Sequence, residues 1–231
     1  MGLHLLTQWQ MDRSAVEDVV RFDQPTYRLR YRLLNLDREM SLPMWFSAAL
    51  MAGNGGLMLL AGWAQHRRGG GGVLGWLFLG LFFLALSVDE ASAIHEVLVD
   101  RVQGFLGEYA TGLLFYAWYV PVLALGAVIL IGLVPFLRGL PRRTFWLLAL
   151  SVGVFLLGAV GFESLMGMAV EPTGSDEPPL QSPGWRFVAL VVMEEGLELL
   201  GMALLCYAML SYLSLRVRLT LVDADDAAPR V

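Results

Sequence analysis

The sequence contains no lysine, one cysteine and only three histidines. Since all 16 basic residues are arginines, no lysine Schiff base can form, and this excludes a retinal protein of the rhodopsin type. The single Cys206 excludes an intrachain disulfide. The formal charge of -5 gives no reason to expect nucleic-acid binding. Residues 1–10 lack the basic segment and cleavage site of a removable signal peptide, so none is expected.

Apolar residues are abundant, at 57% of the chain with a mean hydropathy of +0.61. Five stretches are long enough to cross about 30 Å of hydrocarbon as helices. The sequence therefore predicts an all-α, polytopic helical membrane protein with about five transmembrane helices. The predicted spans are 43–65, 73–99, 112–137, 144–170 and 185–213.

Three parts are expected along the chain: an amphipathic N-terminal cap over 1–42, a transmembrane domain over 43–213 and a cytoplasmic tail over 214–231. The cap is ambiguous, because Arg28, Arg30 and Arg32 alternate with apolar residues as in a short strand. Amphipathic helices and an irregular cap both remain open for this segment.

The connections between spans predict the orientation. Arginines follow the first, third and fifth spans, whereas the other two loops are acidic on balance. The positive-inside rule then places the N-terminus outside and the C-terminus in the cytoplasm of a cell inner membrane. A hidden span within 1–42 would move the N-terminus to the other side.

Seven carboxylates and one histidine interrupt the apolar spans. Each ionised group facing lipid would cost about 2.5–3.5 kcal/mol, so such groups are expected to face one another, water, a proton or a bound cation. The predicted topology places them at one level in the outer half of the membrane, which favours a single site. They are Asp89, Glu90, His95, Glu96, Glu163, Glu194, Glu195 and Glu198.

Helical angles refine this grouping at about 100° per residue. On one continuous helix, Asp89, Glu96 and Asp100 share a face that His95 flanks, while Glu90 points away from it. Glu194 and Glu198 lie one turn apart, with Glu195 beside them. Further polar candidates at this level are Ser47, Asn54, Tyr116 and Tyr119. The tryptophans fall mostly near span ends and are interpreted as an interfacial belt.

Clustered carboxylates either share protons or hold a cation. Carboxylate oxygens with one imidazole suit zinc, iron or manganese, so a divalent metal is the predicted cofactor. The pattern partly matches the di-metal helical bundles, although position 92 is Ser where their Glu-x-x-His motif needs Glu. The predicted ligands are Asp89, His95, Glu96, Glu163, Glu194 and Glu198. Glu90 and Glu195 are the predicted catalytic acid/base residues.

Two segments carry a family resemblance. Ser87 to Glu96 reads S-x-D-E-x4-H-E and Glu194 to Glu198 reads E-E-x2-E, which resemble motifs of uncharacterised bacterial multipass membrane proteins. A weaker similarity is to the ceramidase- and adiponectin-receptor-like membrane hydrolases. It implies a zinc hydrolase, with Ser87, Asp89 and His95 matching residue types of its site. Glu194 and Glu198 stand where that superfamily has a later histidine pair, and about five spans replace seven.

Three functions remain open. The first is a metal-dependent membrane enzyme, a hydrolase or di-metal oxidase, acting on a lipid or another membrane-soluble substrate. The second is a protein that handles cations or protons. The third is a non-catalytic accessory subunit whose acids pair with arginines of 1–42 or of a partner. A partner membrane subunit and a homo-oligomer are both compatible with these readings.

Overall fold

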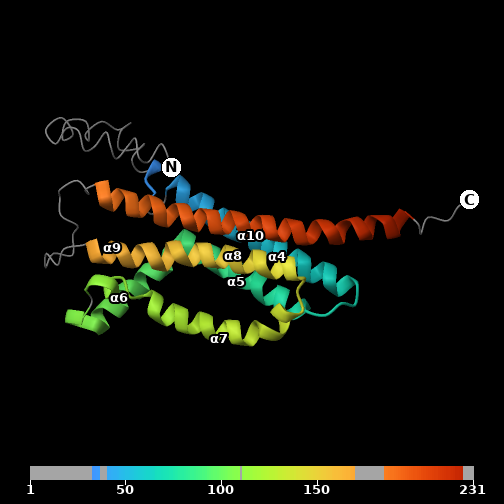
Figure 1. The fold of residues 1–231 in the computed structure, drawn as a ribbon, viewed down its shortest axis with the longest axis horizontal. Coiled ribbons are helices and arrows are strands. Elements are labelled where there is room, and N and C mark those ends of the chain that lie inside the picture. Colours follow the sequence, from blue (N-terminus) through green and yellow to red (C-terminus); the bar gives the residue numbers. More distant parts are fainter. Residues whose placement is uncertain (1–32, 37–40, 110, 170–184, 226–231) are drawn as a thin grey trace, which may run out of the picture.

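The computed structural model describes residues 33–36, 41–109, 111–169 and 185–225, and these residues contain helices and turns but no strand. Figure 1 shows long helices lying side by side in one elongated bundle. The expectations for the cap over 1–42, including the strand around Arg30, lie almost wholly outside the described residues. So does the end of the predicted tail, 226–231.

The first two long helices form an antiparallel pair, α4 (Leu42–Arg67) and α5 (Val73–Ser92). Helix α4 begins at Ser41, whose side chain accepts a hydrogen bond from the Met44 amide at 3.3 Å and so caps the helix. The two backbones touch, because a Cβ on Gly55 would lie only 2.9 Å from the Gly80 carbonyl oxygen. Glycine at this crossing therefore sets how closely α4 and α5 approach.

The second predicted span is broken. Helix α5 ends at Ser92, Ala93 has φ 50° and ψ 39°, and a separate helix α6 (Ile94–Leu106) follows. The predicted continuous helix over 73–99 is therefore wrong, and with it the shared face of Asp89 and Glu96. The apolar pattern continues through the break, and the left-handed conformation of one alanine leaves no signal in that pattern.

The third predicted span starts later than expected. Two short 3₁₀ turns, η1 (Gly107–Tyr109) and η2 (Gly112–Leu114), precede α7 (Tyr119–Arg138). None of the most apolar 18-residue window of α7 is buried, and Ile131 is 71% exposed. Helix α7 lies along one edge of the bundle, apart from the other long helices (Figure 1).

The fourth span is one helical run with a change of winding. Helix α8 (Arg142–Leu156) passes into a π-helical segment, η3 (Leu157–Phe162), and then into α9 (Glu163–Ala169). The 41-residue helix α10 (Trp185–Asp225) packs along α4, α8 and η3. The main core lies between these helices and α5. Its buried residues are Met51, Met58, Ala61, Trp76, Phe83, Leu148, Met202, Leu205, Ala208, Met209, Tyr212 and Leu213.

Four helical segments of the described chain are long and apolar enough to cross a membrane: α4, α5, α7 and the run Arg142–Met168. The sequence predicts about five. The fifth predicted span, 185–213, falls within α10, which is not among these four.

Candidate carboxylate site

Four glutamates from three helical elements gather around a fifth, Glu198. Glu90 comes from the end of α5, Glu163 is the first residue of α9, and Glu194 and Glu195 precede Glu198 on α10. The other four carboxylates all act electrostatically on Glu198. All five side chains are partly buried. We call this set the glutamate cluster.

Glycine lets the helices of the cluster approach at backbone distance. A Cβ on Gly158 of η3 would lie 2.7 Å from the Glu194 carbonyl oxygen and 3.0 Å from Cγ of Glu198. One turn further along α10, a Cβ on Gly201 would lie 2.7 Å from the Phe155 amide nitrogen. The π-helical segment and α10 are therefore in direct contact where α10 presents its glutamates.

Glu163 is held by an indole. The Nε1–H of Trp118 donates to both carboxylate oxygens of Glu163, at 2.8 and 2.9 Å. Trp118 stands immediately before α7, and Glu163 follows the π-helical segment directly. Segments of this kind recur at functional sites, where the extra residue per turn re-aims the side chains that follow. Sequence reasoning missed this role and assigned Trp118 to an interfacial belt.

A buried amide lies next to the cluster on the side of the core. Asn54 of α4 is 0% exposed, and its Nδ2 donates to the Met202 carbonyl at 3.0 Å. Met202 comes one helical turn after Glu198 on α10. The Oδ1 atom of Asn54 accepts no hydrogen bond from the described residues. A buried acceptor of this kind costs about 1–3 kcal/mol when unsatisfied, so Asn54 marks a polar position within an otherwise apolar layer.

The structure differs from the sequence predictions at several side chains. Glu90, predicted to point away from the shared face of its helix, is the α5 carboxylate that acts electrostatically on Glu198. The Ser87 hydroxyl donates to the Ala48 carbonyl at 2.7 Å, so it joins α5 to α4. The Tyr119 hydroxyl donates to the Leu113 carbonyl and not to a carboxylate.

The predicted metal ligands are only partly described. His95 and Glu96 belong to α6, beyond the break at Ala93, and their side chains lie outside the described part of the structure. Among the side chains that are described, no group of three or more His, Cys, Asp or Glu residues is arranged to hold a metal ion. The six-residue ligand set therefore stays a prediction.

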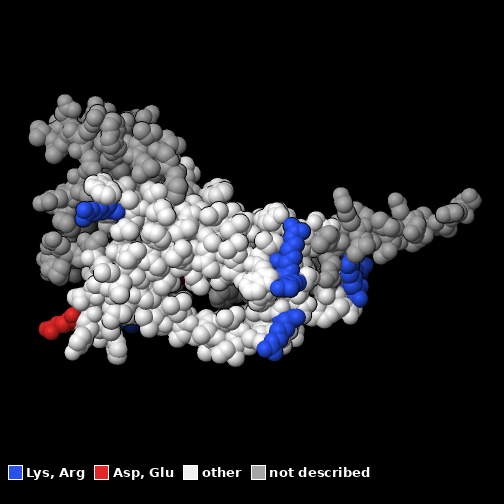
Figure 2. Space-filling view, viewed as in Figure 1, with Lys and Arg blue, Asp and Glu red and all other residues white. Residues whose placement is uncertain are grey.

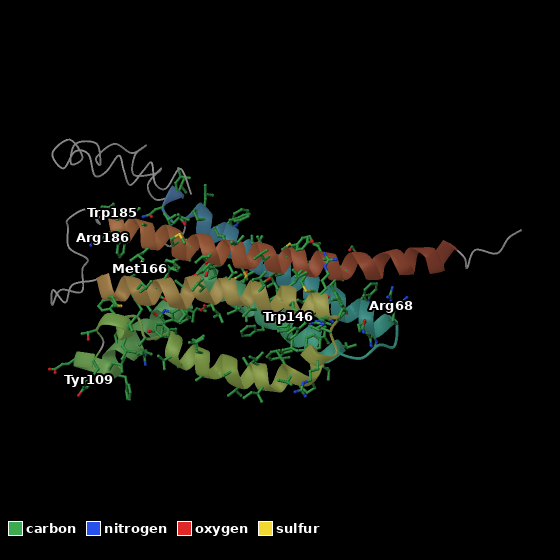
Figure 3. All side chains as sticks on the ribbon, viewed as in Figure 1. Arg68, Tyr109, Trp146, Met166, Trp185 and Arg186 are labelled. Carbon is green, nitrogen blue, oxygen red and sulfur yellow. The ribbon has the colours of Figure 1, made fainter. Side chains whose placement is uncertain are left out.

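The interfacial belt is wrong for Trp76 as well. Its side chain is 1% exposed, with the ring centroid 5.1 Å from that of Phe136 and 4.9 Å from that of Tyr212. Trp185, by contrast, is 73% exposed at the start of α10. Figure 3 places Trp185 and Arg186 at one end of the bundle and Arg68 at the other, with Met166 between α9 and α10.

Comparison with known proteins assigns a family. The model for a domain of unknown function, DUF8692, matches residues 5–212. The chain belongs to this family. No curated protein and no solved structure shows significant similarity to it. The match spans most of the predicted cap and nearly all of the transmembrane domain. The family assignment fits the resemblance to uncharacterised proteins, while the ceramidase-like similarity stays a prediction.

Proposed function

We propose that this member of the DUF8692 family is an integral membrane protein in which α4, α5, α7, the α8–α9 run and α10 all cross the bilayer. The large exposed apolar side chains support this, among them Leu74 at 82% and Val128 at 66% exposure. Figure 2 shows arginines gathered toward the end of the molecule where the α4–α5 and α7–α8 turns lie. The positive-inside rule makes that end cytoplasmic, with the glutamate cluster in the outer half and the C-terminus inside.

We further propose that the glutamate cluster handles protons. The arrangement that supports this is the gathering of four glutamates around a fifth, Glu198, in a partly buried site, where burial and like charge both disfavour a full set of ionised carboxylates. Like charges in a partly desolvated site repel one another, so the fully ionised cluster is unfavourable, and sharing protons relieves the repulsion. A proton needs no fixed coordination geometry, so acids from three helical elements can share it.

The surroundings favour proton binding at one level over conduction across the bundle. Beyond Asn54, the core between α4, α5 and α10 is built from apolar residues such as Met58, Leu205 and Met209. A conducting path needs a chain of polar groups or water. The cluster then acts as a proton-operated site open toward one side, whose charge state changes how η3 and α10 pack against each other.

A metal-dependent enzyme is the competing function, and one contact favours it. Carboxylates that bind metals are held by outer hydrogen bonds, as Trp118 holds Glu163. In that function Glu163, Glu194 and Glu198 would ligate a Zn, Fe or Mn ion together with Asp89 and the α6 residues His95 and Glu96. Glu90 and Glu195 would be the acid/base residues on a lipid substrate.

The stability of Glu198→Gln separates these functions. Glutamine resembles a protonated glutamate and removes one charge from the cluster. Proton sharing predicts that the variant is more stable than the wild type at pH 8, by about 1–3 kcal/mol for directly interacting groups. The difference should shrink as the pH falls and the wild-type carboxyls take up protons. Thermal unfolding of detergent-purified protein measures both values, with Glu108→Gln at an exposed residue of η1 as the control.

The opposite sign would contradict proton sharing. If a metal ion or arginine neutralises the cluster, Glu198→Gln loses stability at pH 8. Elemental analysis of the same two preparations then distinguishes the remaining alternatives. About one or two Zn, Fe or Mn ions per chain, lost in the variant, would establish the metal site, while no metal in either protein would point to arginine pairing.

A further inference from the structure

The end of the bundle remote from the glutamate cluster contains an open groove. It has a volume of about 830 Å³ and lies between the first half of α5, the second half of α7 and Tyr212 of α10. Figure 2 shows the molecule hollowed between α7, along the lower edge, and the helices above it. Glu198 precedes Tyr212 by 14 residues, so the two sites are separated by about 21 Å along α10.

The groove wall is mostly apolar. Its lining includes the rings of Trp76, Phe78 and Phe136 and the aliphatic side chain of Ile129, and it contains no acidic or basic residue. Gly132 leaves the α7 side open, because nothing lies within 4 Å of a Cβ placed there. A volume within the roughly 300–1,000 Å³ of small-molecule sites and a mostly apolar lining suit a hydrocarbon chain.

Two exposed arginines lie next to the groove lining in the sequence. Gly139 and Pro141 line the groove, and Arg138 and Arg142 immediately flank them. The helices α5 and α8 both begin at this end without a side-chain cap, so their first amides add positive potential. Basic pockets between membrane helices on the cytoplasmic side are sites for anionic lipid headgroups.

Arg143, the neighbour of Arg142, faces elsewhere. Its Nη2 donates to the Tyr207 hydroxyl of α10 at 3.2 Å. Arg186 lies at the opposite end of the bundle, with its guanidinium 5.6 Å from the centroid of the Trp185 ring (Figure 3). These two arginines carry the same charge as Arg138 and Arg142 but do not flank the groove. They supply a charge-matched control.

We propose that this groove binds one anionic phospholipid, with an acyl chain along Trp76, Phe78 and Gly132 and the phosphate at Arg138 and Arg142. The inference shares the membrane location with the proposed function but does not involve the glutamates. Bound lipid fills the space between α5 and α7 and ties α7 to the bundle. Phe136 of α7 contacts α5, where it packs on Trp76 and over Gly75.

Native mass spectrometry of purified full-length protein tests the site with dioleoyl phosphatidylglycerol and, for comparison, dioleoyl phosphatidylcholine. The wild type is expected to retain one phosphatidylglycerol preferentially. Arg138→Gln/Arg142→Gln should lower its affinity by about fivefold for each arginine removed, from the typical value of a basic residue near anionic lipid. Arg143→Gln/Arg186→Gln should retain wild-type affinity. Equal retention of the two lipids, or equal losses in the two double variants, would overturn the proposal.

A second pair of variants tests the apolar part of the groove. Gly132→Phe places a ring in the groove and should abolish retention of the lipid. Gly126→Phe is the control on the same helix. A Cβ at position 126 also meets nothing within 4 Å, but Gly126 does not line the groove, so this variant should retain the lipid. Retention in folded Gly132→Phe would contradict the proposal. Loss in both variants would attribute the effect to α7 in general and would also count against it.

Discussion

The two ends of the bundle differ in how their helices meet. At the glutamate end, α10 touches η3 at Gly158 and α8 at Gly201, and an indole fixes Glu163. At the arginine end, glycines such as Gly132 leave a groove open. The same residue type therefore closes one end and opens the other. Whether helices touch at a glycine or leave a groove there depends on the element that faces that glycine.

The largest expected loss of unfolding free energy comes from Gly158→Ala, which adds a methyl group where η3 touches α10. The new Cβ would meet the Glu194 carbonyl oxygen at 2.7 Å, a backbone atom that cannot move independently of α10. Overpacking of this kind costs about 1–3 kcal/mol. Gly153→Ala is the matched control in α8, since a Cβ there meets nothing within 4 Å, and it should gain up to about 1 kcal/mol of helix propensity. Thermal unfolding in detergent measures both, and equal effects would refute the close packing.

A smaller effect is expected from Trp118→Phe, which keeps an aromatic ring but removes the donor to Glu163. Loss of a hydrogen bond to a charged group should cost about 1.5 kcal/mol of unfolding free energy. Trp146→Phe, at a 59% exposed position, should have little effect. Combining Trp118→Phe with Glu163→Gln completes a double-mutant cycle. Strictly additive losses would show that the indole does not hold the carboxylate.

The smallest effect concerns the helix break beside the cluster. Ala93 has a left-handed backbone at φ 50°, which glycine adopts without the steric cost of a Cβ. Ala93→Gly should therefore raise the unfolding free energy by about 0.5–1 kcal/mol. The same change at Ala85, inside α5 and exposed, should lower it by about 1 kcal/mol. A loss of stability in Ala93→Gly would indicate that α5 and α6 are continuous in solution.

Hydropathy predicted the long helices well because length and apolarity are properties of whole segments. The predicted span 43–65 corresponds to α4, and 144–170 to the α8–α9 run. The break at Ala93 could not be predicted, because one residue in a left-handed conformation leaves the apolar pattern intact. The 41-residue length of α10 was also missed, since its polar C-terminal part does not resemble a span.

The sequence predicted which acids lie at the level of the candidate site but not their angular positions. The level of the acids along each span follows from simple counting at about 1.5 Å per residue, and it brought Glu163 and Glu198 to the same end. Their angular positions depend on the helix winding, which changes at the break after Ser92 and at the π-helical segment. Trp118 was missed because a tryptophan near a span end usually reflects the interface.

We propose that the glutamate cluster holds a shared proton. Infrared difference spectroscopy can detect that proton. Spectra of the purified protein at pH 6 and pH 9 report the carbonyl stretch of protonated carboxyl groups. A shared proton should give a protonated carboxyl signal that disappears on raising the pH and is reduced in Glu198→Gln but not in Glu108→Gln. Carboxylates that are ionised throughout this range, or a signal that Glu198→Gln leaves unchanged, would contradict it.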